Sequence, residues 1–415
     1  MENIKILFVG GTFDLQNGKS SGLVQKMIDE IKNINIDNYI LSITSFNGGN
    51  YNNLENILNT SKEYDFVFWW ANVDNSLPKI RDVKEVAPYT MLINSKRDDI
   101  DKYSFNELVQ RSLAVKANLT FKFKKVEDKL FNITIFDPLG AVWYDGTNIQ
   151  DAIKTSINRL IFLKSMTRQK TIKSDTSKGL VMSWYFDQFK QDEYQSDKII
   201  DIPKENDFIN TVKKYALQFQ KFMPVNCKTE RFIGNASLRP VPPQIGRCGK
   251  GMPSFRKDNM IFVSKRNIDK QFITLDNFVP VYMENNKLMY CGDEKPSVDT
   301  PVQIKLYEAL PNINYILHSH CYIKNADYTH TAIPCGAIEE FDEITKIIKN
   351  KELNNYKINL KGHGSLIMWD NMENFHKNIE PNLEYIPRSL PEKMYDNNDK
   401  NINNNYDQEI DIERI

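Results

Sequence analysis

Three of the five histidines lie in two short segments whose spacing suits a metal site. Tyr315 to His320 reads YILHSH, an apolar run that ends in two histidines two positions apart. Because side chains alternate along a strand, we expect His318 and His320 on one face. His363 stands between two glycines in the strand-like run INLKGHGSLIM, where small neighbours allow a close backbone approach. Three neutral imidazoles from two strands predict a facial site for Zn²⁺ or a similar divalent ion, with positions open for substrate.

The alternative for each of these histidines is local packing or capping. His330 and His376 lack a comparable setting, and we interpret them as structural or solvent-facing.

Asp299 is the acidic residue best placed to work beside such a site. It ends the segment KPSVD, directly before a helical run at Val302–Leu310. Two interpretations are equally supported. The carboxylate caps the helix by accepting backbone N–H groups, or it lies beside the metal and takes and returns a proton.

We interpret two other pairs of residues near these segments as structural. Glu339 and Glu340 open a helical run that reaches Lys349, where acidic side chains interact favourably with the helix dipole. Cys321 and Cys335 lack the spacing of a zinc–cysteine motif, so we interpret both as buried thiols.

These segments, in this order, resemble the class II aldolase/adducin family over roughly residues 206–370. The family includes sugar-phosphate aldolases, ribulose-phosphate epimerases and methylthioribulose-phosphate dehydratases. The matching segments are GNASLR from Gly234 (the family's G-N-x-S-x-R turn), Met260–Val281 (strand, phosphate loop, strand), KPSVD (P-S-S-E), HSH (H-[ST]-H) and KGHGSLIM (N-H-G). No single motif is decisive, but their order is specific.

The resemblance implies that His318, His320 and His363 bind the divalent metal and that Asp299 acts as the base. It further implies that a substrate phosphate is held by Asn235, Ser237, Ser264 and Ser297.

The chain departs from the family pattern in three places. The acid is Asp rather than Glu. The loop Val263-Ser264-Lys265-Arg266 replaces T-x-S-G, so a glycine is missing and two cations are added, and residues 241–257 form an insertion. Lys265 or Arg266 would add charge against a phosphate or carboxylate. The alternative is an exposed basic turn.

We therefore expect a metal-dependent lyase of the aldolase type. It would cleave or form a carbon–carbon bond in a small sugar or sugar phosphate through a metal-stabilised enediolate. The alternatives are an epimerase or dehydratase of a sugar phosphate at the same site, or a non-catalytic adducin-like interaction module. The resemblance also implies a homotetramer with sites at subunit interfaces.

The elements that position these residues predict two domains. Residues 1–165 alternate short apolar runs with helical segments, which predicts a Rossmann-like α/β domain with an open, mostly parallel sheet. Residues 166–205 are a polar linker, residues 206–385 an α/β/α class II aldolase-like domain, and residues 386–415 a disordered acidic, Asn-rich tail. The expected strands are Ile4–Val9, Tyr39–Ile43, Phe66–Trp70, Thr90–Asn94, Leu119–Phe123 and Phe131–Phe136, and the expected helices Ser21–Ile34, Phe105–Lys116, Asp151–Phe162 and Phe208–Phe222.

A glycine-containing loop follows the first expected strand. It contains Gly11, Lys19 and Ser20, and a loop between strand and helix can hold a phosphate on free backbone N–H groups. Six residues rather than four separate Gly11 from Gly18, so it is not a P-loop. A nucleotide or phosphate ligand here is one interpretation, and a tight turn without a ligand is the other.

Composition limits the remaining possibilities. The 415 residues carry 54 basic and 54 acidic side chains, so no global basic excess exists to hold nucleic acid. No apolar run approaches the ~20 residues of a membrane span. The five cysteines form no CxxC pair, which favours reduced thiols and the cytoplasm (the host cytoplasm for a viral protein).

Overall fold

The computed structural model describes two compact units of the chain. One unit comprises Met1–Ser165 with Ser389–Ile415, and the other comprises Met166–Arg388. The described residues are 1–73, 76–77, 83–127, 130–174, 205–222, 234–239, 260–292 and 294–395. Most of the expected linker, the insertion at residues 241–257 and the end of the expected tail lie outside them.

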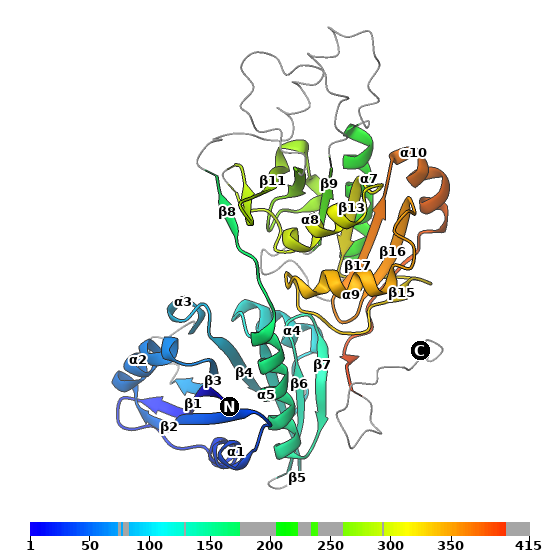
Figure 1. Cartoon of the computed structure of the whole chain (residues 1–415). Coiled ribbons are helices and arrows are strands. Elements are labelled where there is room, and N and C mark those ends of the chain that lie inside the picture. Colours follow the sequence, from blue (N-terminus) through cyan, green and yellow to red (C-terminus); the bar gives the residue numbers. More distant parts are fainter. Residues whose placement is uncertain are drawn as a thin grey trace, which may run out of the picture. The chain divides into compact units, whose positions relative to one another are not determined.

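The first unit is built on an eight-stranded sheet of order β19-β7-β6-β5-β4-β3-β1-β2 (Figure 1). Neighbouring strands from β2 to β5 are parallel, while β6 is antiparallel to both of its neighbours. The strands are β1 (Glu2–Asp14), β2 (Tyr39–Asn50), β3 (Phe66–Val73), β4 (Met91–Arg97), β5 (Leu119–Glu127), β6 (Leu130–Phe136), β7 (Ala141–Gly146) and β19 (Glu392–Lys393). This mostly parallel sheet confirms the fold class expected for residues 1–165.

Helices cover both faces of this sheet because its inner strands are apolar on both sides. In β1, Ile6 and Phe8 pack in one core with α1 (Gly22–Asn33) and α5 (Ile149–Ser165). Leu7 and Val9 pack in the other core with α2 (Tyr51–Thr60) and α3 (Val83–Val86). The unit also contains α4 (Phe105–Ala114) and the short helix η1 (Ser61–Glu63).

The expected glycine loop is partly strand, because β1 continues through Gly10 and Gly11 and pairs with β3 as far as Val73. The Thr12 N–H donates to the Lys19 carbonyl at 2.9 Å, and the Gly18 N–H donates to the Gly49 carbonyl at 2.8 Å. The chain itself therefore satisfies two of the N–H groups that a phosphate would use. A nucleotide or phosphate ligand at this loop stays a prediction.

The second unit is built on a nine-stranded sheet of order β15-β16-β17-β13-β9-β10-β11-β12-β8. All neighbouring strands are antiparallel except the edge pairs β15–β16 and β12–β8. The strands are β8 (Thr171–Lys173), β9 (Asn235–Leu238), β10 (Ile261–Ser264), β11 (Phe278–Glu284), β12 (Lys287–Tyr290), β13 (Tyr315–Ser319), β15 (Asp327–Tyr328), β16 (Asn355–Leu360) and β17 (Gly364–Trp369). A separate pair joins β14 (Tyr322–Ile323) to β18 (Tyr385–Ile386).

Two apolar cores lie on the two faces of this sheet, which gives the expected α/β/α layers. Phe208 and Val212 of α7 (Glu205–Phe222) pack on one face. Leu306 of α8 (Thr300–Ala309) and Ile344 of α9 (Glu339–Ile347) pack on the other. The shorter helices are η3 (Lys270–Phe272), η4 (Leu275–Asn277), α10 (Met372–Asn374), η5 (Phe375–Ile379) and η6 (Glu380–Asn382). No helix among the described residues is long and apolar enough to span a membrane.

Three local expectations differ from the structure. β8 lies inside the expected linker, and β19 lies inside the expected tail. Both are two- or three-residue edge strands, too short to show a hydrophobic period. The run INLKGHGSLIM is a hairpin rather than one strand, because Gly362 has a φ of +69° and reverses the chain between β16 and β17.

Candidate metal centre

The hairpin turn places His363 beside the end of β13. Gly364 follows the turn, and a Cβ atom there would lie 1.9 Å from the Ser319 carbonyl oxygen, so only glycine permits this approach. The ring centroids of His318, His320 and His363 consequently lie 4.7 to 5.1 Å apart. All three residues are buried, and their ligand atoms lie within 4.8 Å of one another.

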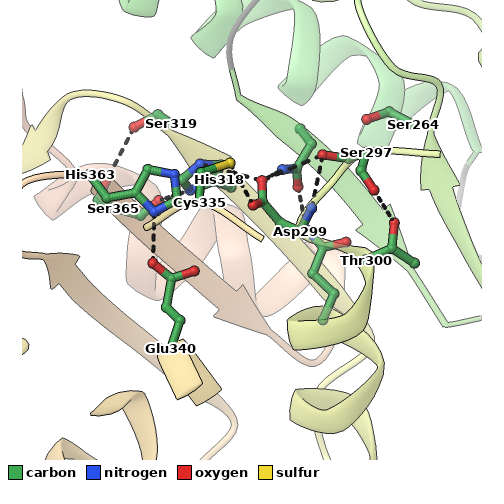
Figure 2. A network of polar contacts seen from close by, with 12 residues as sticks. Ser264, Ser297, Asp299, Thr300, His318, Ser319, Cys335, Glu340, His363 and Ser365 are labelled. Atoms are coloured by element: carbon green, nitrogen blue, oxygen red, sulfur yellow. Dashed lines mark hydrogen bonds and ion pairs between the residues drawn. The ribbon is translucent and has the colours of Figure 1, made fainter. Parts of the chain in front are cut away.

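Hydrogen bonds fix the orientation of two of these rings. His318 Nδ1 lies 3.0 Å from the Ser365 carbonyl oxygen, and His363 Nδ1 lies 2.7 Å from Glu340 Oε1 (Figure 2). A carbonyl or carboxylate oxygen only accepts, so each Nδ1 carries the proton and each Nε2 presents a lone pair. Both Nε2 atoms are buried and have no hydrogen-bond partner among the described residues. This arrangement fits a divalent metal ion, for which these nitrogens would be ligands.

The protonation states of His318 and His320 also suit metal binding. Burial lowers the pKa of His318 to about 4. Burial likewise lowers the pKa of His320 well below its usual value. Both imidazoles are therefore neutral near pH 7, as nitrogen ligands must be. Burial lowers the pKa of His363 too, but the adjacent Glu340 carboxylate outweighs it and leaves this pKa raised.

Glu340 does more than favour a helix dipole. Its side chain is buried, burial raises its pKa, and its Oε1 accepts the proton of His363 Nδ1. Its neighbour Glu339 instead accepts the Thr167 backbone N–H, at 2.9 and 3.1 Å to its two carboxylate oxygens. A carboxylate behind a histidine is the usual support of a metal-binding imidazole.

Asp299 occupies the N-cap position of α8, but its side chain makes no capping hydrogen bond. Instead, its carboxylate points toward the histidines (Figure 2). Oδ2 accepts from Asn235 Nδ2 at 2.7 Å and lies 3.9 Å from His318 Nε2. Of the two interpretations open from the sequence, capping of the helix by this side chain is therefore not seen, and a carboxylate beside a metal stays a prediction.

The Asp299 carboxylate is held in its charged form. Burial raises its pKa, but the facing rings of His318 and His363 and hydrogen bonds from Cys335 and the Gly336 N–H outweigh burial, so the pKa lies below its usual value. A buried carboxylate that stays ionised is available to accept a proton.

Cys335 lies beside the site and contacts one of its residues. Its Sγ donates to Asp299 Oδ1 at 3.0 Å, and its side chain is half-buried. The ligand atoms of Asp299, Cys335 and His363 lie within 4.8 Å of one another. Cys321, by contrast, is fully buried and contacts the Ser319 hydroxyl at 3.2 Å.

The residues expected to hold a substrate phosphate divide into three groups. Ser297 Oγ lies 3.4 Å from Asp299 Oδ2, and the Ser297 backbone N–H donates to the Ser264 carbonyl (Figure 2). Asn235 also contacts Asp299, so these three residues form the first group, on the Asp299 side of the centre. Ser237 is buried against the Tyr307 hydroxyl at 2.9 Å.

Lys265 and Arg266 form the third group and follow β10. The Arg266 side chain is exposed, and its Nε donates to the Pro296 carbonyl at 3.3 Å. Both the anion-binding and the basic-turn interpretation of this pair remain open.

Three further residues near the centre were not singled out from the sequence. Gln303 is buried and donates to Asn235 Oδ1; it lies one helical turn after Asp299, a spacing that shares one helix face. Arg388 is buried and donates to the His363 carbonyl at 3.3 Å. The buried Lys270 lies near enough to lower the pKa of His318 and His320. With Glu340, these contacts span up to 68 residues of sequence, so no local pattern indicates them.

Comparison with known proteins gives one family match. Residues 223–335 match the family model described as Class II Aldolase and Adducin N-terminal domain.

Solved structures give more distant similarities. An L-fuculose 1-phosphate aldolase is 16% identical over 43% of this chain and 82% of its own, with a TM-score of 0.29. YgbL from Escherichia coli, a putative aldolase/epimerase/decarboxylase, is 14% identical over 43% of this chain and 85% of its own, with a TM-score of 0.27. A DNA/pantothenate metabolism flavoprotein from Streptococcus pneumoniae is 13% identical over 38% of this chain and 99% of its own, with a TM-score of 0.30.

The family match covers the first two of the three histidines, Asp299 and Cys335, and it agrees with the order of motifs in the sequence. Residues 223–335 of this chain are therefore similar to the class II aldolase/adducin family.

Proposed function

We propose that this protein is a divalent-metal-dependent lyase of the class II aldolase type, acting on a small sugar or sugar phosphate. The observation that carries the proposal is the pair of buried, unpartnered Nε2 atoms of His318 and His363, which face an ionised Asp299. A scaffold that only bound other proteins would have no use for buried imidazole lone pairs left without a partner.

The proposed chemistry divides between the metal and the carboxylate. A bound divalent ion supplies a Lewis acid that polarises a substrate carbonyl and offsets the charge that develops as the neighbouring bond breaks or forms. Asp299 takes a proton from the reacting hydroxyl and returns it. Asn235 orients that carboxylate by donating to Oδ2, and Gln303 in turn holds the Asn235 amide.

We assign substrate binding to the side of the centre formed by Asn235, Ser264 and Ser297. Hydroxyl and amide donors there suit phosphate or sugar oxygens. Lys265 and Arg266 follow β10 directly and would add positive charge for a phosphate. Three imidazole nitrogens favour zinc over magnesium, which prefers oxygen ligands.

The first test is the metal content of the full-length protein, purified without chelator and measured by mass spectrometry. We expect about one zinc or other divalent ion per chain. The double variant His318→Ala/His320→Ala should lose it. His330→Ala/His376→Ala is the matched control, because it removes two imidazoles outside the centre, and it should retain the metal. A wild-type protein that binds no metal even after addition of zinc would exclude the lyase and leave a family fold used for binding.

Product analysis then separates the reactions. Phosphorylated ketoses that yield two smaller carbonyl compounds establish an aldolase. A product with the same number of carbons indicates an epimerase, and loss of water indicates a dehydratase.

Asp299→Asn tests the base directly. The substitution keeps the shape of the side chain but removes the carboxylate. We expect the metal content to stay the same and kcat to fall by about 10²- to 10⁴-fold. Unchanged turnover would exclude Asp299 as the base.

A further inference from the structure

We propose that the Cys335 thiolate is a protein ligand of the divalent metal ion, in addition to the three histidines. This inference rests on the proposed function, because it requires a metal at the histidine centre. It assigns to the centre a sulfur donor that the sequence pattern did not indicate.

The two groups of ligand atoms share one histidine. The three histidines form one group, and Asp299, Cys335 and His363 form the other, each within 4.8 Å. His363 belongs to both groups. Its Nδ1 is held by Glu340, so Nε2 is the nitrogen left for a metal, and this atom is buried without a partner. Because His363 has both His318 and Cys335 within 4.8 Å of its ligand atom, an ion bound to it would have both residues nearby.

The spacing agrees with tetrahedral coordination. Zinc binds sulfur at about 2.3 Å and nitrogen at about 2.0–2.1 Å, which places the two ligand atoms about 3.6 Å apart. The ligand atoms lie up to 4.8 Å apart, so side-chain shifts on the order of 1 Å would bring them to that distance. Coordination breaks the S–H bond and forms a metal–sulfur bond, and the proton passes to solvent. Because zinc sites expand to five ligands, substrate can still bind.

The backbone holds Cys335 against the centre. Gly336 has a φ of +76°, and a Cβ atom on it would lie 2.9 Å from the Val298 carbonyl oxygen. This close approach lets the Gly336 N–H donate to the Asp299 carboxylate. The Ala337 N–H closes the turn on the Pro334 carbonyl at 3.1 Å. The thiol therefore faces Asp299 because of its turn, and the sulfur has only a short path to the ion.

Cobalt substitution of the full-length protein tests the proposal, because a thiolate bound to Co²⁺ absorbs in the near ultraviolet while the bound ion itself absorbs in the visible. We expect the wild type to show both signals at about one Co²⁺ per chain. Cys335→Ser should keep the visible bands and lose the near-ultraviolet band. Cys321→Ser is the matched control, since Cys321 is a buried thiol that follows His320 in the sequence but contacts Ser319, and it should keep both signals. Cys291→Ser serves as a second control.

The outcomes separate this proposal from the previous one. Visible bands without a near-ultraviolet band in the wild type, or a band that survives Cys335→Ser, would overturn the Cys335 assignment and leave the histidine centre intact. Absence of any cobalt signal would overturn both. A second measurement compares metals. Removal of a soft ligand should weaken Cd²⁺ binding by at least about tenfold relative to Mn²⁺. Equal losses for the two metals would count against the thiolate.

Discussion

Glu339 and Glu340 are adjacent acids whose side chains have different partners. Glu340 fixes the proton of His363 on Nδ1, so we expect Glu340→Gln to lower metal affinity by about 10- to 100-fold. Competition against a chromogenic chelator measures this. Glu339→Gln removes the same charge from the same helical turn and should leave the affinity within about twofold. Equal losses in the two variants would show that helix charge, rather than the His363 contact, sets the affinity.

Residue types and spacing predict the three histidines and the position of Asp299, because strand alternation and motif order are local properties. The partners of these residues are not local. Glu340 lies 23 positions before His363, and Cys335 lies 36 positions after Asp299. Each also has a plausible local interpretation, as a first-turn acid or a buried thiol. Only the folded chain decides between these interpretations.

At the scale of elements, the approach of the β16–β17 hairpin to β13 depends on Gly364. We expect Gly364→Ala to destabilise the second unit by several kcal/mol and to abolish metal binding, because the new methyl would overlap the Ser319 carbonyl. Urea unfolding and metal analysis measure the two effects. Gly22→Ala at the start of α1 is the control. A Cβ atom there meets nothing within 4 Å, so stability should be unchanged or slightly higher.

The contact between η5 and α7 should stabilise the fold to a degree that depends on pH. His376 of η5 lies between Glu380, 2.6 Å from Nδ1, and Asp207 of α7, 3.0 Å from Nε2. Hydrogen bonding to Glu380, followed by the Asp207 contact, raises the pKa of His376 above 6.5 despite some burial. The folded chain therefore binds this proton more tightly than the unfolded chain. The stabilisation is complete below about pH 6.5 and is lost as the pH rises through the raised pKa.

Comparison of the wild type with His376→Gln measures this contact. Because His376 is half-exposed, we expect the wild type to be more stable by at most about 1 kcal/mol near pH 6, with the difference fading toward pH 9. Lys214 and the Tyr215 hydroxyl also contact Glu380. Both contacts are present in the wild type and the variant, so their contributions to stability cancel in the comparison. A difference that grows as the pH rises would contradict the assignment.

Helices and strands can be predicted from the sequence where their hydrophobic period extends over enough residues to be recognised. The expected helix at Phe105–Lys116 corresponds to α4, whose start is marked by a capping box between Ser104 and Glu107. In contrast, α2 was not expected, since its asparagine-rich sequence YNNLENILNT carries only three buried apolar residues. Its helical state depends on packing against the core around Leu7 and Val9.

At the scale of the whole molecule, the chain returns to its first unit after completing the second. Met394 of the returning segment is buried, its N–H donates to the Val142 carbonyl at 2.8 Å, and the Leu390 side chain packs over Gly140. Truncation after Arg388 should lower the stability of the first unit by about 2 kcal/mol, mainly from lost burial. Metal binding should persist, because every proposed ligand precedes the cut.

Calorimetry resolves the two units as separate transitions if they unfold independently. Truncation after Tyr395 is the control, because it keeps β19 and should leave the first transition in place. An unchanged first transition after truncation at Arg388 would show that β19 adds little to the sheet.

The return of β19 also has a consequence for synthesis on the ribosome. Strand β7 is complete once residue 146 has been made, but its neighbour at residues 392–393 emerges only after the whole second unit. At ordinary translation rates this delay is on the order of tens of seconds. Throughout it, the nascent first unit presents an unpaired strand edge of the kind that other chains can join. The growing polypeptide therefore needs protection most while its second unit is still being translated.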